Sequence, residues 1–276
     1  MVDILTILLI SIPAGFIGSL TGLGGGSITI PLLVVLGVPV KYAIAASMVT
    51  IIATSSGSAA SYVKEKIANV KVAMYLEMFT IIGAIIGASI TSILEPRLLY
   101  FFFAAFLLTS FLGMRRYIKE EVPVNVKQDR LSKWLELQGT YHDQKLQKDI
   151  EYKLTNPLLG GAGMIVAGLA AGMLGIGAGA FKVSIHELVL RMPSKVSTAT
   201  SNFIIGMTAL AGVSIYFTSG LLYIDLAAPM AIGTMAGSIA GSRLLNRFSN
   251  KSIRIFFLVV VGALIVQMLY KGIVKP

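Results

Sequence analysis

Two short glycine-rich segments interrupt long apolar runs of this 276-residue chain. The first is Gly22-Leu23-Gly24-Gly25-Gly26 and the second is Gly175-Ile176-Gly177-Ala178-Gly179. Each glycine costs a helix about 1 kcal/mol relative to alanine, so we predict that both segments break the helices that enter them. In a membrane, lipid cannot satisfy the backbone groups that such a break frees. Both breaks must then be buried in protein or line a water-filled cavity.

The composition is that of a polytopic membrane protein. Hydrophobic residues make up 55% of the chain and charged residues 13%, with a mean hydropathy of +0.82, which is too apolar for a soluble domain. The first apolar run begins at Ile4 and has no preceding basic residue, so we interpret it as a membrane segment rather than a secretory signal. The chain contains no cysteine, which excludes disulfides, thiolate metal sites and thiol catalysis.

Ten apolar runs follow one another along the chain. They lie at about residues 4–20, 27–38, 43–62, 72–94, 98–114, 158–174, 180–190, 196–217, 221–242 and 253–270. Runs of about 20 residues are long enough to span a bilayer as helices. The runs that follow the glycine segments, 27–38 and 180–190, are too short, and we predict that they form the second arms of helical hairpins or broken helices.

The two halves of the chain repeat each other with an offset of 153, which becomes 154 after the short runs. The matched pairs include Gly15 and Gly168, Gly22 and Gly175, Gly24 and Gly177, Pro39 and Pro193, Lys41 and Lys195, Ser47 and Ser201, Tyr62 and Tyr216, Gly83 and Gly237, and Gly87 and Gly241. Agreement at spaced glycine and polar positions is more specific than shared hydropathy, so we infer a duplication. The paired glycines four residues apart in long runs are typical of close helix packing.

The distribution of basic residues indicates how the halves are related. An odd number of crossings per half places 18 of them on one side, in the loops 64–71, 115–157, 191–195 and 243–254. The other side then holds Lys41, Arg97, Lys271 and Lys275, whereas an even number would give 14 against 8. The positive-inside rule favours the odd count, which makes the two repeats inverted. Because the basic residues lie in short loops, the net charge of +10 does not indicate nucleic-acid binding.

We therefore predict an all-α polytopic membrane protein with two inverted repeats, each a glycine-broken helical hairpin plus about three transmembrane helices. Residues 1–114 form the first repeat, 115–157 a polar cytoplasmic linker and 158–276 the second repeat. The multi-pass protein is expected in the cell membrane.

The polar linker holds nine basic and seven acidic residues. Leu131, Trp134 and Leu135 fall on one helical face, which allows a short amphipathic helix at the membrane interface. The alternative is a solvated connection between the halves. His142 has no ligand partner nearby in the sequence and is expected to face water.

Helix breaks near the membrane centre direct backbone N–H groups and the positive ends of helix dipoles into the space they enclose. Two such breaks predict one central pocket that suits a small anion, although the glycines could instead serve tight packing. The backbone candidates for anion binding are Gly24, Gly25, Gly26, Gly177, Ala178 and Gly179.

Hydroxyl and amide side chains follow each break within an apolar run. They are Ser47, Thr50, Thr54, Ser55 and Ser58 in the first half, and Thr198, Thr200, Ser201 and Asn202 in the second. Such groups can bind an oxyanion, although a hydroxyl in a membrane helix usually bonds its own backbone. The candidates for substrate binding are Ser47, Thr200, Ser201 and Asn202.

Ionisable residues inside apolar runs cost at least about 2.5 kcal/mol at a helix centre and are therefore functional candidates. Glu77 could carry a proton during transport, or could pair with Lys71 at the interface. Lys182 could face the bound anion, or its long side chain could reach the cytoplasmic side. His186 and Glu187 are expected at the interface.

No catalytic constellation is present in the sequence. Neither a repeated metal-ligand spacing nor a Gly-x-Ser-x-Gly or Walker motif occurs, so we expect no enzyme activity, no metal and no cofactor. Transport would then use an ion gradient or the gradient of the substrate.

Several of these segments resemble the TauE/SafE sulfite exporter family, the TSUP permeases. They are GLGGGSITIP from Gly22, GIGAGAFKVS from Gly175, ATSNF from Ala199, and the paired Gly-Ala dipeptides at 83 and 87. The resemblance covers about residues 5–114 and 160–270 but not the linker. Two departures concern the second break: Ala178 stands where a third consecutive glycine is common, and Ser184 where proline is frequent.

The resemblance implies a permease for small sulfur-containing anions such as sulfite, thiosulfate or organosulfonates. The expected partners are this anion, the lipid bilayer and a coupling proton or other ion, and not nucleic acid. A passive anion channel of the same fold and a non-transporting membrane scaffold are the alternative functions. The particular anion, the direction of transport and the oligomeric state do not follow from the sequence.

Overall fold

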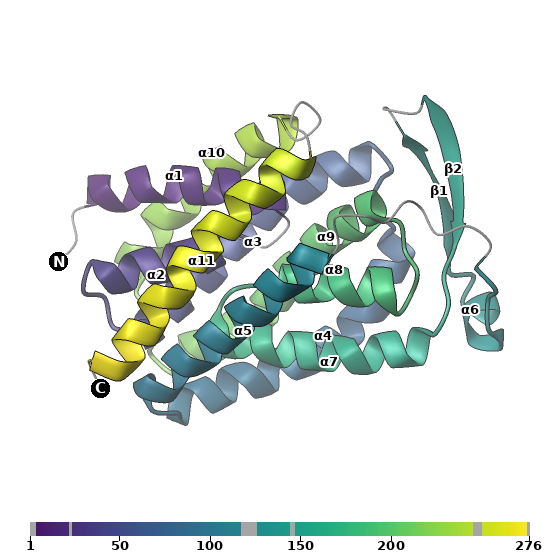
Figure 1. The fold of residues 1–276 in the computed structure, drawn as a ribbon. Coiled ribbons are helices and arrows are strands. Elements are labelled where there is room, and N and C mark those ends of the chain that lie inside the picture. Colours follow the sequence, from purple (N-terminus) through teal and green to yellow (C-terminus); the bar gives the residue numbers. More distant parts are fainter. Residues whose placement is uncertain (1–3, 22–23, 117–125, 144–146, 245–249, 275–276) are drawn as a thin grey trace.

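A computed structural model describes residues 4–21, 24–116, 126–143, 147–244 and 250–274 (Figure 1). The first half contains α1 (Ile4–Thr21), α2 (Gly26–Val35), α3 (Val40–Lys64), α4 (Val70–Ile93) and α5 (Pro96–Arg116). The second contains α7 (Pro157–Leu174), α8 (Gly179–Leu188), α9 (Ser194–Thr218), α10 (Ile224–Leu244) and α11 (Asn250–Val274). Between them lie α6 (Arg130–Trp134), β1 (Gln138–Asp143) and β2 (Lys148–Lys153).

The all-α membrane architecture predicted from the sequence is confirmed. Within the described residues, five helices are long and apolar enough to cross a membrane. They occupy Val40–Lys64, Val70–Ile93, Pro157–Leu174, Lys195–Thr218 and Ile224–Arg243. Shorter apolar helical stretches lie at Ile4–Ser19, Gly26–Val35, Pro96–Thr109 and Ile265–Val274.

Both glycine segments separate a long helix from a short one, as predicted. α1 ends at Thr21 before α2, and α7 ends at Leu174 before α8. Gly24, Gly175 and Gly177 have φ angles of +74°, +63° and +70°, in the left-handed region that glycine adopts without steric cost. Gly22 and Leu23 lie outside the described residues.

The two halves interlock through reciprocal helix pairs, α1 with α10 and α4 with α7. A Cβ atom added at Gly15 of α1 would overlap the backbone of Thr234, and one added at Gly168 of α7 would overlap the backbone of Thr80. Gly15 matches Gly168 at an offset of 153, and Thr80 matches Thr234 at 154. The same close contact therefore occurs twice.

The paired glycines predicted to pack helices do so. Gly83 faces the backbone of Ile165 and Leu169, while Gly237 faces the backbone of Ile12 and Phe16 at equivalent places. Larger side chains at either glycine would separate the helices.

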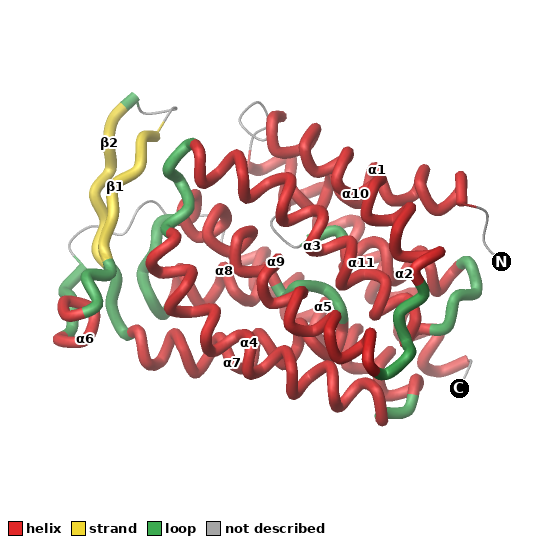
Figure 2. Tube along the Cα trace, turned by 180° about the vertical axis from the view of Figure 1, so that it is seen from behind, coloured by secondary structure: helices red, strands yellow, loops and turns green. Residues whose placement is uncertain are grey.

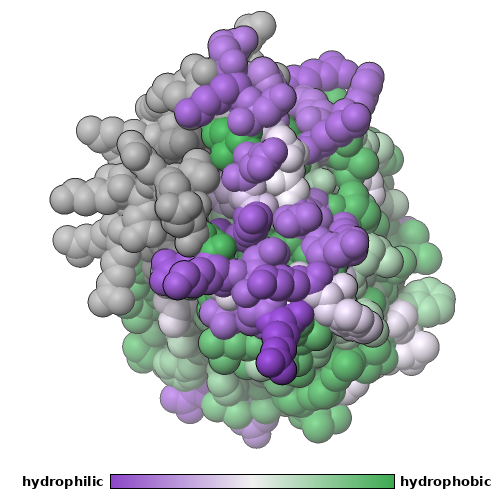
Figure 3. Space-filling model, turned by 90° about the vertical axis from the view of Figure 1, so that its right-hand side faces the viewer, coloured by the Kyte–Doolittle hydropathy of each residue, from purple (hydrophilic) through white to green (hydrophobic). Residues whose placement is uncertain are grey.

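α1 and its matching helix α7 run in opposite directions along the long axis of the molecule (Figure 1). In Figure 1, α1 starts near the N-terminus and runs toward the end that carries the β-hairpin, whereas α7 starts at the hairpin and runs away from it. Both chain ends lie at the side opposite the hairpin, which the view from behind also shows (Figure 2). Figure 3 shows hydrophilic residues gathered on the hairpin end, with hydrophobic residues around them.

The polar linker folds into a structure that neither reading of its sequence anticipated. β1 and β2 form an antiparallel hairpin, and α6 is a single helical turn that leaves Trp134 78% exposed. Residues 130–143 and 147–154, here called the hairpin cap, instead bury four other side chains against α4 and its neighbours: Leu137, Tyr141, Tyr152 and Leu154. Alternating apolar residues in a polar segment were the available signal for this hairpin.

His142 faces water as predicted, with a side chain that is 53% exposed. Its Nδ1 atom lies 2.8 Å from a carboxylate oxygen of Asp149 on the opposite strand. The pairing of the strands supplied this partner.

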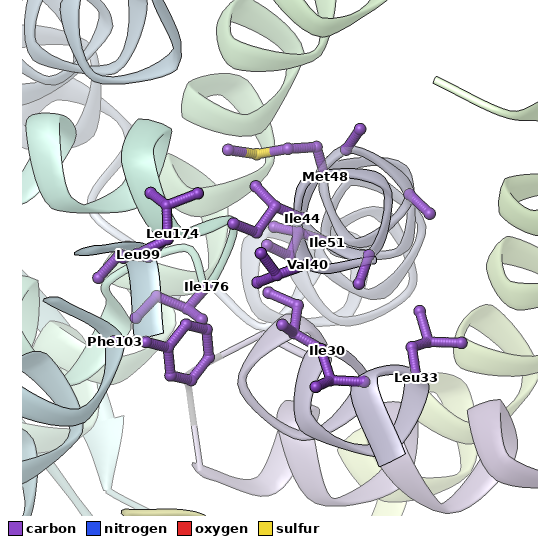
Figure 4. Close-up of a cluster of buried hydrophobic side chains, with 14 of the residues drawn as sticks. Ile30, Leu33, Val40, Ile44, Met48, Ile51, Leu99, Phe103, Leu174 and Ile176 are labelled. Atoms are coloured by element: carbon purple, nitrogen blue, oxygen red, sulfur yellow. The ribbon is translucent and has the colours of Figure 1, made fainter. Parts of the chain in front are cut away.

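A large apolar core surrounds the second break (Figure 4). Ile176, between the two left-handed glycines, is buried with Ile44 of α3 and Phe103 of α5. Ile30 of α2 belongs to the same cluster. The core therefore holds the broken segments of both halves against α3.

Candidate functional site

The two glycine breaks touch each other at the centre of the helix assembly. A Cβ atom at Gly26 would overlap the carbonyl oxygen of Gly175 and would lie 2.9 Å from the side chain of Ile51. A Cβ atom at Gly24 would lie 3.4 Å from Ile51 and 3.5 Å from Ile205. Tertiary packing thus brings together the two segments that the sequence singled out.

Ser47 and Ser201, matched by the repeat, both direct their hydroxyls at the second break. Ser47 Oγ lies 2.7 Å from the carbonyl oxygen of Gly175 and 2.6 Å from that of Ile44. Ser201 Oγ lies 3.5 Å from the carbonyl oxygen of Gly179. Both serines are fully buried, so the hydroxyls face the break and not lipid.

The start of α8 has a left-handed residue that is not glycine. Ala178 has φ +51° and ψ +29°, and its carbonyl oxygen accepts a hydrogen bond from the backbone N–H of Lys182 at 3.0 Å. This conformation costs an alanine roughly 1–2 kcal/mol. Ala178 therefore keeps the loop conformation that a third glycine would adopt without strain.

The other polar candidates on α9 form contacts that lead away from the breaks. Asn202 donates from its side-chain Nδ2 to the backbone carbonyl oxygen of Thr198 at 3.1 Å. The backbone carbonyl oxygen of Asn202 accepts a hydrogen bond from the hydroxyl of Ser55. Thr200 Oγ1 accepts from the backbone N–H of Asn69 at 3.0 Å. Asn69 also donates to the hydroxyl of Tyr152 at 2.9 Å, so Thr200 connects α9 with the hairpin cap.

Glu77 and Lys182 are connected through a hydroxyl that sequence reasoning missed. Lys182 Nζ donates to Thr208 Oγ1 at 2.8 Å. Thr208 Oγ1 lies 3.1 Å and 3.2 Å from the two carboxylate oxygens of Glu77. Thr80 Oγ1 lies 2.9 Å from one of the same oxygens. Lys182 is 0% exposed and Glu77 2%, so both ionisable groups are enclosed by protein.

These contacts rule out one of the two alternatives that the sequence left open for Glu77, and one of the two for Lys182. Lys71 pairs with Glu136 of the hairpin cap at 2.7 Å and not with Glu77. Lys182 does not reach the cytoplasmic side, because its ammonium group is bonded inside the protein. Thr208 matches Thr54 and Thr80 matches Thr234 at the repeat offset, and these matched threonines in apolar runs were the signal that could have identified them.

His186 lies inside the protein and not at the interface where it was expected. Its side chain is 0% exposed, and its Nδ1 atom lies 3.4 Å from the carbonyl oxygen of Ser197. Its Nε2 atom has no hydrogen-bond partner among the residues that the structure describes. Since Lys182 precedes His186 by four residues, the two side chains share one face of α8.

The model of the family described as "Sulfite exporter TauE/SafE" matches residues 7–268. The chain belongs to the TauE/SafE family. No solved structure matches the chain.

Relatives in this family cover nearly the whole chain. "Probable membrane transporter protein YunE" of Bacillus subtilis is 27% identical over 94% of this chain and 95% of its own length. "Probable membrane transporter protein YdhB" of the same organism is 29% identical over 89% and 90%. "Probable membrane transporter protein MJ0441" of Methanocaldococcus jannaschii is 24% identical over 94% and 92%.

Family and fold together identify a multi-pass membrane transporter. The apolar helices supply the membrane segments, and membership of the TauE/SafE family implies a permease and a small-molecule substrate.

Proposed function

We propose that this TauE/SafE protein is a secondary transporter that moves a small sulfur-containing anion across the cell membrane. Sulfite, thiosulfate and organosulfonates are the proposed substrate class. The observation that carries the proposal is a fully buried lysine, Lys182, in the first turn of the short helix that follows the second glycine break. A buried cation within a membrane protein marks a substrate or ion pathway.

The proposed anion site lies where the two breaks meet. Backbone groups of Gly24, Gly25, Gly26, Gly177, Ala178 and Gly179 surround it. The hydroxyls of Ser47 and Ser201 would bind the anion directly, and Lys182 would supply the positive charge. Thr200 and Asn202, whose present contacts lie outside the breaks, would take part only if α9 moved. The positive end of the α8 dipole adds to the charge of Lys182. The serine hydroxyls now donate to carbonyl oxygens and can turn to an anion with little movement of the backbone.

We propose that the two halves are inverted repeats that expose this site alternately to the two sides of the membrane. The opposite directions of α1 and α7 (Figure 1) and the reciprocal glycine contacts support this arrangement. Lys71 of the loop 64–71 contacts Glu136 of the hairpin cap, so this basic loop lies at the hairpin end. Together with the 18 basic residues that the sequence assigns to the loops of one side, this contact supports a cytoplasmic position for the linker.

Glu77 is the proposed proton carrier of the transport cycle. It is a buried carboxylate on a membrane helix and it shares Thr208 with Lys182. A group that gains and loses a proton beside the substrate site can couple transport to the proton gradient.

Flux into proteoliposomes tests the proposed function. Purified protein should take up labelled thiosulfate or sulfite with saturation, and a pH gradient imposed across the membrane should change the rate. Flux that rises linearly with concentration and ignores the pH gradient would identify a passive channel. A protein that transports neither anion nor an organosulfonate would contradict the proposed substrate class, and a lack of any flux would favour the scaffold alternative.

A further inference from the structure

A single hydroxyl group separates the buried carboxylate from the buried ammonium. The charged atoms of Glu77 and Lys182 do not come within 4.0 Å of each other in the described structure. Thr208 Oγ1 accepts from Lys182 and faces both carboxylate oxygens of Glu77. The two charges therefore interact through a group that can change its own hydrogen bonding.

Besides the carboxylate of Glu77, a second acceptor lies within reach of the Thr208 hydroxyl, and it can take the hydroxyl proton when Glu77 is protonated. Its Oγ1 atom lies 2.8 Å from the carbonyl oxygen of Ile204, one turn earlier on α9. With an ionised Glu77, Thr208 donates to the carboxylate. With a protonated Glu77, the carboxyl O–H donates to Thr208, whose own proton then turns to Ile204.

The hydroxyl of Thr80 also has two acceptors, one of which is the carboxyl group of Glu77. Its Oγ1 atom lies 2.9 Å from Glu77 Oε2 and 3.0 Å from the backbone carbonyl oxygen of Glu77. Rotation of two O–H groups thus satisfies both protonation states of Glu77, and the backbone does not have to move.

Charge balance links the protonation state of Glu77 to the binding of the anion. Ionised Glu77 and protonated Lys182 together form a neutral unit inside an apolar assembly. An anion bound to Lys182 would leave the unit with an uncompensated negative charge, which burial makes costly. A proton on Glu77 removes that charge and releases Lys182 from its carboxylate partner.

We propose that the transported anion and ionised Glu77 compete for Lys182, so that anion binding takes up a proton at Glu77. This inference rests on the proposed function, since it assumes that an anion binds at Lys182. It adds the sign of the coupling: anion and proton bind together and leave together.

Four of the neighbouring helices, α3, α5, α7 and α9, contain no Asp or Glu in their described residues. α7, which packs against α4, has no titratable residue in Pro157–Leu174. α9 carries Lys195 and Tyr216 near its two ends, and α3 has its titratable residues near its ends. α5 carries Arg97, Tyr100, Arg115 and Arg116. On α8, His186 stands one turn beyond Lys182, with Glu187 after it, and His186 is the competing proton acceptor that a test must separate from Glu77.

The charged unit occurs only once in the duplicated fold. The threonines recur as Thr54 and Thr234, but the positions that match Glu77 and Lys182 hold Ala231 and Thr29. One carboxylate therefore predicts an uptake of at most about one proton for each bound anion.

Titration calorimetry in two buffers of different ionisation enthalpy measures the protons taken up on binding. Full-length protein in detergent would be titrated with thiosulfate and, separately, with sulfoacetate, from acidic to alkaline pH. Wild type should bind more tightly as the pH falls, by up to about tenfold per unit, and take up protons where Glu77 starts ionised.

Four variants separate the roles of the individual groups. Glu77→Gln should bind the anion with no proton uptake and no pH dependence. Glu136→Gln in the hairpin cap is the matched control for removal of a carboxylate and should behave as wild type. His186→Gln should keep the proton uptake of wild type. The double variant Glu77→Gln with Lys182→Met, which removes both buried charges and so avoids an unpaired one, should fold but lose anion binding.

The outcomes distinguish this inference from the proposed function. Binding without proton uptake, or uptake that persists in Glu77→Gln, would overturn the competition while the transporter assignment stands. If proton uptake is lost in His186→Gln but not in Glu77→Gln, the proposed competition at Lys182 is also overturned. A wild type and a Glu77→Gln variant that bind neither anion at any pH would overturn both the inference and the proposed substrate class.

Discussion

The hydroxyl of Ser47 lies 2.7 Å from the carbonyl oxygen of Gly175, a contact between residues 128 positions apart. Ser47 belongs to the first half and Gly175 opens the break of the second. The break of one half is therefore held by a helix of the other, and movement of the halves against each other must change the proposed anion site.

Replacement of Ser47 by alanine should destabilise the protein by about 1–3 kcal/mol, because it leaves a buried carbonyl group at the break without this donor. It should also weaken anion binding. Thermal unfolding in detergent with and without thiosulfate measures both effects. Ser56→Ala is the matched control on α3, since Ser56 is exposed and bonds the carbonyl of Ile52 in its own helix. Equal behaviour of the two variants would contradict a special role for Ser47.

Gly26→Ala should separate the two breaks. The added Cβ atom would overlap the carbonyl oxygen of Gly175, a backbone atom that cannot turn away. Overpacking of this kind costs typically about 1–3 kcal/mol, so we expect a lower Tm and slower transport. Gly262→Ala is the control, because the nearest heavy atom to its Cβ among the described residues would be a Phe111 ring atom at 3.9 Å. Wild-type stability and flux in Gly26→Ala would show that the breaks do not need this contact.

Thr208→Val should impair transport more than it impairs folding. Valine keeps the approximate shape but removes the oxygen that Lys182 and Glu77 share, at a cost of about 1–3 kcal/mol for the buried groups left unsatisfied. Thr208→Ser retains the hydroxyl, so its flux should depend on pH as it does in wild type. Proteoliposome uptake at several pH values compares the three proteins. If valine and serine variants respond to pH alike, the hydroxyl is not part of the coupling.

The hairpin cap should loosen in acid through Glu136. The hydrogen bond and charge of Lys71 lower the pKa of Glu136 below its ordinary value of 4.5. Because the folded-state pKa is the lower one, the contact contributes fully above the ordinary value and is lost as the pH falls through the lowered one. The effect should be small, since both side chains are exposed. A carboxyl NMR titration of Glu136 should show the lowered pKa in wild type and an ordinary one in Lys71→Ala.

Tyr152→Phe should loosen the cap independently of pH. The change removes the hydroxyl that accepts from Asn69 Nδ2 at 2.9 Å while the ring stays buried. Hydrogen exchange of the cap amides should become faster, and that of α7 should not change. Protection equal to wild type would show that the apolar contacts alone hold the cap.

The sequence by itself determined the local elements of this protein. Glycine propensity located both breaks, hydropathy located the membrane helices, and the repeat matched Gly15 with Gly168 before their contacts were known. These properties depend on residues close together in the chain, where propensity and periodicity act.

Only the tertiary structure decided which polar groups meet. Glu77 and Lys182 are 105 positions apart in the numbering, and Thr208 joins them because α4, α8 and α9 pack together. The same packing buries His186, and strand pairing turns the polar linker into a cap. Contacts of this kind depend on the arrangement of whole helices, which the spacing of residues along one helix does not encode.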